Sequence, residues 1–150
     1  MTNRTLFLAA ASTLIAAAAL PASAAMPAKG DGGVKLSATL SGAAEVPRAG
    51  DPDGTGSFMA RVNPGQGRVC YTLTVANIAA ATMAHIHRGA VGVAGPVVVP
   101  LTPPTSGSSE ACATITRELA MALIQHPEQY YANVHNAAFP GGAVRGQLTK

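Results

Sequence analysis

The stretch Met83-Ala84-His85-Ile86-His87-Arg88-Gly89 holds two of the four histidines of the 150-residue chain and leads into a glycine-rich bend. Its polar and apolar residues alternate, which is typical of a β-strand with one face against a core. Residues two apart in a strand point to the same face, so His85 and His87 are expected together, with Ile86 on the other face. The stretch therefore predicts a half-buried strand that carries two aligned imidazole rings.

A third histidine, His135, ends the stretch Tyr130-Tyr131-Ala132-Asn133-Val134-His135, which also has the character of a strand. If the fold brings this strand close to the first, three imidazole rings converge. Neutral imidazole is the commonest protein ligand of zinc and copper, and three such nitrogens make a site for one ion. The sequence therefore predicts a copper or zinc site at His85, His87 and His135.

The same histidines have a second interpretation. Histidines in small domains often satisfy buried hydrogen bonds between loops and strands. The three rings and Asn133 would then form a polar network that pins the glycine-rich bend. Asn133 and Arg145 are the expected supporting residues of a metal site, and Arg145 has the alternative of pairing with an acidic side chain.

The N-terminal segment, residues 1–24, has the layout of a secretory signal peptide. One basic residue precedes an apolar run, and Ala22-Ser23-Ala24 forms a small-residue cleavage signal. The alternative is a retained membrane anchor, because the apolar run is about long enough to span a bilayer. Cleavage would leave residues 25–33 as a flexible leader and residues 34–150 as one domain. We expect that domain in the periplasm or outside the cell, without a membrane span.

Composition narrows the range of partners. The net charge is +3, and the chain has three tyrosines, three phenylalanines and no tryptophan. A nucleic-acid surface needs clustered basic residues and aromatic side chains for stacking, whereas the basic residues here are scattered. We expect no nucleic-acid partner, which leaves a metal ion and an unidentified protein as possible partners.

The chain contains two cysteines, Cys70 and Cys112. An even number of cysteines in an exported chain favours one disulfide over two separate buried thiols. This disulfide would close a loop of about 40 residues. Cys70 falls on the face of its strand opposite the apolar residues, so it is expected to link that strand to a neighbouring element.

Short strands separated by turn clusters fill the domain. We expect strands at residues 34–40, 57–62, 68–75, 83–87, 97–99, 111–115, 130–135 and 143–148, and one short amphipathic helix over residues 117–125. The alanine-rich residues 77–82 fit either a turn or a short helix. This pattern predicts an all-β fold, an immunoglobulin-like or Greek-key β-sandwich of about seven or eight strands.

Several motifs resemble, in the same order, those of the chordin-type (CHRD) domain family. They span about residues 34–149 and are Leu40-Ser41-Gly42-Ala43-Ala44-Glu45-Val46-Pro47, Cys70-Tyr71, Ala84-His85-Ile86-His87-Arg88-Gly89, Gly95-Pro96-Val97-Val98, Tyr130–His135, Phe139-Pro140-Gly141-Gly142 and Val144-Arg145-Gly146-Gln147-Leu148. The resemblance implies a small extracellular β-sandwich module. Such modules belong to a secreted antagonist of growth-factor signalling in animals and occur as single exported domains of unknown role in bacteria.

Enzyme signatures are sparse. The pattern His85-Ile86-His87 also looks like the copper-binding strand of copper–zinc superoxide dismutases, but the fourth histidine, His126, is expected at a helix end. Too few ligands remain for a second, zinc site, so dismutase activity is not expected. No serine lies in a Gly-x-Ser-x-Gly elbow, and no phosphate-loop lysine follows the glycine-rich bend.

Three hypotheses of function follow. The first is a non-catalytic exported module that holds copper or zinc through the three histidines. The second is a protein- or matrix-interaction module in which the histidines form a structural network. The third is a mononuclear metalloenzyme with an open coordination position.

Overall fold

The computed structural model describes residues 32–150, so the predicted signal peptide and most of the predicted leader lie outside the described residues. This part of the chain forms eight strands, one α-helix and two short 3₁₀ helices. In chain order they are β1 (Val34–Ser41), η1 (Gly42–Ala44), β2 (Thr55–Asn63), β3 (Arg68–Ala76), β4 (Ala81–Arg88), β5 (Val97–Leu101), β6 (Ser108–Thr114), α1 (Arg117–Gln125), η2 (Pro127–Gln129), β7 (Tyr130–Asn136) and β8 (Val144–Gln147). None of the helices in this range is both long enough and apolar enough to cross a bilayer.

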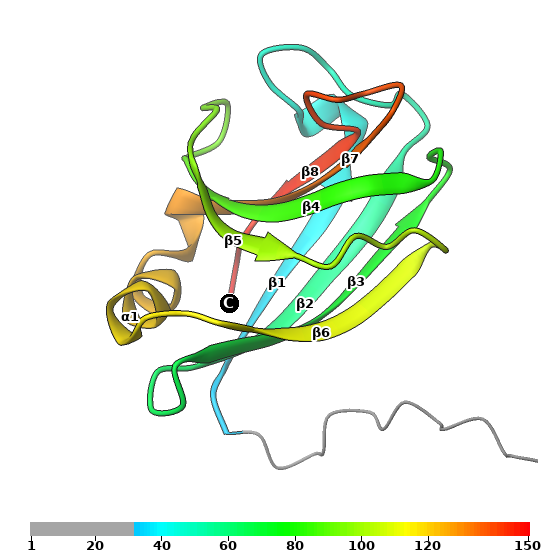
Figure 1. The fold of residues 1–150 in the computed structure, drawn as a ribbon. Coiled ribbons are helices and arrows are strands. Elements are labelled where there is room, and N and C mark those ends of the chain that lie inside the picture. Colours follow the sequence, from blue (N-terminus) through cyan, green and yellow to red (C-terminus); the bar gives the residue numbers. More distant parts are fainter. Residues whose placement is uncertain (1–31) are drawn as a thin grey trace, which may run out of the picture.

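The strands form one antiparallel sheet in the order β5-β4-β7-β8-β1-β2-β3-β6. Strands β8 and β1 share a single registered pair, Arg145 with Ser41, so two four-stranded halves meet at a short seam. The sheet curls until β5 and β6 approach each other (Figure 1), and the Ser109 hydroxyl donates a hydrogen bond to the Thr102 carbonyl at 2.8 Å. The predicted all-β fold with one helix is confirmed, and a β-sandwich is consistent with the two halves of the nearly closed sheet.

The core lies inside the curled sheet because apolar side chains alternate along its strands. The predicted inward face of β3 is confirmed, since Val69, Tyr71 and Leu73 are buried. Helix α1 lies at one end of the sheet (Figure 1) and packs Ala120 and Leu123 into the core. The other buried members of the core include Leu36, Leu40, Phe58, Val62, Ala84, Ile86, Val99, Ala132, Val134, Val144 and Leu148.

The alanine-rich segment before β4 is a turn followed by strand, and not a short helix. Asn77 adopts a left-handed backbone conformation with φ of 58°, which asparagine tolerates better than most residues. Strand β4 then begins at Ala81, two residues earlier than the sequence pattern indicates. The early start extends the pairing of β4 with β7 as far as Asn136.

The predicted disulfide is confirmed. Cys70 on β3 and Cys112 on β6 are directly opposite each other in the antiparallel register and are bonded. Because β6 is the last strand of the sheet, the bond fastens this edge strand to its only neighbour in the strand order.

We predict that removing the disulfide weakens the fold substantially. The bond joins residues 42 positions apart, so its loss in a double variant, Cys70→Ala with Cys112→Ala, frees a long loop in the unfolded chain. We expect the free energy of unfolding to fall by about 3–4 kcal/mol in the chain-entropy model. Urea unfolding of the variant and of the wild-type protein, with and without reductant, measures the change. A loss below about 1 kcal/mol would contradict the expectation.

Candidate metal centre

The outer face of strands β4 and β7 carries the polar side chains that the core excludes. Ile86 is 1% exposed and points into the core, so its neighbours His85 and His87 point outward, as predicted. Across the pair, His85 lies opposite Asn133 and His87 lies opposite Tyr131. Every residue of β7 is nevertheless buried, because loops cover its outer face.

The three histidines converge as the sequence predicts. One ring nitrogen from each of His85, His87 and His135 lies within 4.8 Å of the other two. Nδ1 of His85 and Nε2 of His135 are 3.2 Å apart. Two imidazole nitrogens bound to one tetrahedral zinc ion would be separated by about 3.3 Å, given zinc–nitrogen distances of about 2.0–2.1 Å. This pair therefore already has a spacing that suits a shared ion.

Two backbone carbonyls fix the protonation of two of the rings. His87 Nδ1 lies 2.8 Å from the Gly95 carbonyl oxygen, and His135 Nδ1 lies 3.0 Å from the Pro140 carbonyl oxygen. A carbonyl only accepts hydrogen bonds, so each Nδ1 carries a proton, and in the neutral form of each ring Nε2 then holds the lone pair. Metal-binding histidines in proteins are commonly oriented in this way.

The Nε2 atom of His87 is the unusual atom of the cluster. It is buried and has no hydrogen-bond partner among the described residues. A buried polar atom without a partner costs free energy, so such an atom calls for an explanation. A bound cation at the cluster would satisfy the lone pair of this nitrogen.

The environment also disfavours the charged form of two of the imidazoles, those of His85 and His135. Burial lowers the pKa of His85, and the neighbouring His135 and His87 lower it further. Burial likewise lowers the pKa of His135, although the Pro140 carbonyl partly offsets this effect. Neutral imidazole is the form that binds a metal ion, so the lowered pKa values of His85 and His135 favour the ligand form of these two rings.

The glycine-rich bend between β4 and β5 covers the cluster and is held from below by Arg145. This side chain is 2% exposed, and its Nη2 donates hydrogen bonds to the carbonyls of Ala90 and Val93, both at 3.0 Å. The guanidinium carbon lies 3.4 Å from the centre of the Tyr131 ring. That ring in turn stacks on His87, with ring centres 4.8 Å apart and planes within 7°. Through the Tyr131 ring, Arg145 therefore connects the bend to His87.

The bend can follow this path because of its glycines. A side chain at Gly95 would collide with the Arg88 carbonyl, and Gly92 has a left-handed φ of 77°. The close approach brings the Gly95 carbonyl within reach of His87, and the Gly95 amide donates a hydrogen bond to the Tyr131 hydroxyl at 3.2 Å. The glycine spacing thus serves the geometry of the histidine cluster.

Asn133 lies on β7 directly opposite His85. It is 2% exposed, and its Oδ1 atom has no hydrogen-bond partner among the described residues. Its side chain also forms a hydrogen bond with the carboxyl group of Glu45. The sequence-predicted supporting residues Asn133 and Arg145 therefore lie next to the histidines on the same face of the sheet.

Glu45 is a buried residue that sequence reasoning did not identify as part of the site. It follows η1, is 5% exposed and lies against Asn133, Arg145 and Gly142. Burial raises its pKa from 4.5 to about 7, although the charge of Arg145 opposes the rise. Its only signal in the sequence is its place in a motif of the CHRD resemblance, far from the histidines.

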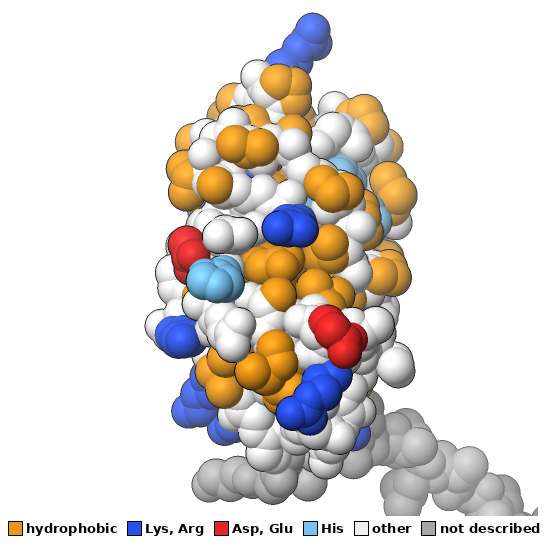
Figure 2. Space-filling view, turned by 90° about the vertical axis from the view of Figure 1, so that its left-hand side faces the viewer, with side chains coloured by type: hydrophobic (Ala, Val, Ile, Leu, Met, Phe, Trp, Pro, Cys, Tyr) orange, Lys and Arg blue, Asp and Glu red, His pale blue; other side chains and the backbone are white. Residues whose placement is uncertain are grey.

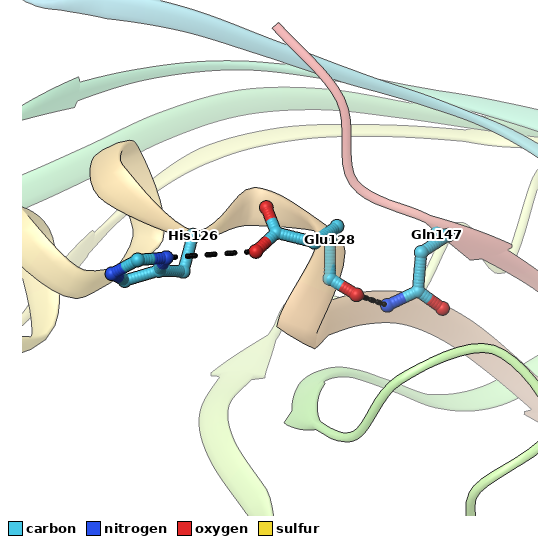
Figure 3. Close-up of polar contacts among 3 residues, drawn as sticks. All are labelled: His126, Glu128 and Gln147. Atoms are coloured by element: carbon cyan, nitrogen blue, oxygen red, sulfur yellow. Dashed lines mark hydrogen bonds and ion pairs between the residues drawn. The ribbon is translucent and has the colours of Figure 1, made fainter.

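His126, the fourth histidine, lies outside the cluster. It caps the C-terminal end of α1, as the sequence indicates, and its Nδ1 atom lies 3.5 Å from a Glu128 carboxylate oxygen (Figure 3). The Gln147 side chain, also drawn there, donates to the Glu128 carbonyl at 2.7 Å and to the Gly89 carbonyl at 2.8 Å. Gln147 therefore anchors the start of the glycine-rich bend, while His126 takes no part in the cluster.

The histidine cluster lies close to the molecular surface. His85 and His87 are partly buried, whereas the Nε2 atom of His87 and the His135 side chain are buried. Figure 2 shows one face of the molecule, on which hydrophobic side chains gather between scattered basic ones.

Together these features define a small antiparallel β-sheet domain, stapled by one disulfide, with a cluster of three histidines that could hold a metal ion. The family model of the CHRD domain matches residues 36–148. The chain therefore belongs to the CHRD domain family. No curated protein and no solved structure matches it.

We predict that the Glu45 carboxyl makes stability depend on pH. As pH rises from about 4.5 to about 7, the unfolded carboxyl releases its proton while the folded one keeps it, so the folded state loses stability. Relative to Glu45→Gln, the free energy of unfolding of the wild-type protein should fall by about 2–3 kcal/mol as pH rises through this range. Urea unfolding of both proteins at about pH 5 and about pH 8 measures the difference.

Comparing the wild-type protein with Glu45→Gln removes the effect of histidine titration on stability. Their lowered pKa values act in the opposite direction, because the unfolded histidines bind protons first as pH falls. Both proteins contain the same histidines, so this contribution cancels in the difference. If the wild-type protein and Glu45→Gln differ in free energy of unfolding by the same amount at both pH values, Glu45 does not titrate differently in the folded state.

Proposed function

We propose that this protein is an exported, non-catalytic CHRD module that binds one copper or zinc ion through His85, His87 and His135. The observation that carries the proposal is the buried Nε2 atom of His87, which has no hydrogen-bond partner among the described residues and belongs to a convergent set of three nitrogens. A hydrogen-bond network made only of the three rings and the carbonyls of Gly95 and Pro140 leaves this atom without a partner, whereas a bound ion would satisfy it.

Three imidazole nitrogens are a set of ligand atoms that suits copper or zinc. Imidazole nitrogen is a good ligand for both ions, whereas calcium and magnesium require oxygen ligands. The carbonyls of Gly95 and Pro140 hold two of the rings with their lone pairs available. Three nitrogens leave a fourth position of a tetrahedral ion for another ligand.

Export is supported by the signal-peptide pattern of residues 1–24 and by the disulfide. Disulfides persist mainly in oxidising compartments, such as the periplasm and the extracellular space. Such compartments also present metal ions to binding proteins without the thiols of the cytosol as competitors. We therefore place the proposed metal binding after export.

A second candidate function follows from one distance. His85 Nδ1 and His135 Nε2, at 3.2 Å, lie within hydrogen-bonding range of each other. If His85 donates a proton to His135, the rings stabilise the bend and the module would act by binding a protein or matrix partner. This interpretation satisfies one pair of nitrogens but leaves His87 Nε2 without a partner.

Metal titration separates the two candidates. We expect calorimetry at about pH 7.5 to show binding of one copper(II) or zinc(II) ion per chain with Kd below about 1 μM. The variant His87→Ala should lose this binding, because one of three nitrogen ligands is gone. The matched control is His126→Ala, which removes an exposed histidine outside the cluster and should bind as the wild-type protein does.

Two results would refute the metal site. One is the absence of metal uptake by the wild-type protein, with His87→Ala merely lowering the thermal midpoint. The other is equal binding by the wild-type protein and His87→Ala, which would place the ion elsewhere. Either result favours the structural network and directs the search to protein partners.

A further inference from the structure

We propose that Met83 supplies a thioether as the fourth ligand of the histidine site and that the ion held there is copper(I). This inference rests on the proposed metal site at His85, His87 and His135 and adds the identity of the ion and of the remaining ligand. It also predicts a closed site, which suits storage or transfer of the ion better than catalysis at an open position.

The register of the sheet places Met83 at the cluster. Met83 lies two residues before His85 on β4, so both side chains leave the same face of the strand. Across the pair it is directly opposite His135. Directly opposed residues have Cβ atoms about 4.5–5.5 Å apart, so the long methionine side chain starts next to a ligand of the proposed site.

A local irregularity of β4 supports this placement. The pairing of β4 with β7 shifts register between Ala81 and Met83. Such bulges re-aim the neighbouring side chains and often occur next to functional sites. The regular pairing from Met83 onwards then fixes the positions of Met83, His85 and His87 along one face.

Packing does not explain Met83. Its side chain is 47% exposed, although methionine normally fills gaps in a core. The core is completed on the other face of β4 by Ala84 and Ile86, both 1% exposed. A flexible, partly exposed thioether on the same face as His85 and opposite His135 can turn toward a bound ion without disturbing the core.

The chemistry of the donors selects copper(I). Soft thioether sulfur prefers copper(I), whereas imidazole alone accepts zinc and both copper oxidation states. The competing donor is the Oδ1 atom of Asn133, which is buried and belongs to the residue directly opposite His85. An amide oxygen is a hard ligand and would favour zinc or copper(II), so the preference for copper(I) distinguishes the sulfur from the oxygen.

The test compares ions in matched variants of the full protein. Met83→Leu keeps the size and apolar character of the side chain but removes the sulfur. Its control is Met59→Leu, which changes a methionine of similar exposure, 58%, on β2. Copper(I) affinity is measured by competition with a chromophoric copper(I) chelator, under ascorbate and without oxygen, and zinc(II) affinity is measured by calorimetry.

We expect Met83→Leu to weaken copper(I) binding at least about tenfold and to change zinc(II) binding by less than about twofold. Met59→Leu should match the wild-type protein for both ions. X-ray absorption at the copper edge should show a sulfur neighbour in the wild-type protein and in Met59→Leu, and none in Met83→Leu. Equal thermal midpoints of the two leucine variants would show that the loss is not one of folding.

Three outcomes would overturn the inference, and they differ from one another. If the wild-type protein and Met83→Leu bind copper(I) equally, with no sulfur neighbour, the histidine site stands and Met83 is not a ligand. If Met83→Leu loses copper(I) and zinc(II) alike, Met83 supports the fold of the site and does not select the ion. If neither ion binds the wild-type protein, the histidine site itself fails and the inference fails with it.

Discussion

The outer face of the sheet depends on the burial of one positive charge, the guanidinium group of Arg145. A buried charge requires hydrogen bonds and compensating charge. Arg145 donates hydrogen bonds to two carbonyls of the glycine-rich bend and lies on the face of the Tyr131 ring, and the nearby Glu45 carboxyl adds negative charge once it ionises at about pH 7. These contacts draw the bend over β7, and the bend then supplies the Gly95 carbonyl that orients His87. The geometry of the histidine cluster follows from this requirement.

Much of the fold was predictable because its strands obey simple alternation. The bounds of α1 agree with its helical spacing, the cap at Thr116 and the stop imposed by Pro127. Two-residue periodicity alone put His85 and His87 on one face, and the even cysteine count predicted the bond between β3 and β6. These features are local, or they depend on the composition of the whole chain, so no knowledge of strand order was needed.

The rest of the site could not be predicted because it depends on contacts between distant segments. Glu45 lies 88 positions before Asn133, and nothing near it indicates that its carboxyl will be buried against that residue. The carbonyls of Gly95 and Pro140 select the ring tautomers, but backbone groups leave no trace in a sequence. The single sheet closed by a short β1–β8 seam likewise depends on a pairing of the first and last strands.

The disulfide also determines which sulfur atoms of the molecule are available as metal ligands. Thiolates bind soft metals more strongly than imidazoles or thioethers do, and two free cysteines would compete for any copper that the protein meets. The bond between Cys70 and Cys112 removes both from this competition, and the described residues include no other cysteine. The oxidant that closes the bond leaves imidazole nitrogens unchanged. Oxidative folding of the sheet thus also decides which of its atoms remain available as ligands.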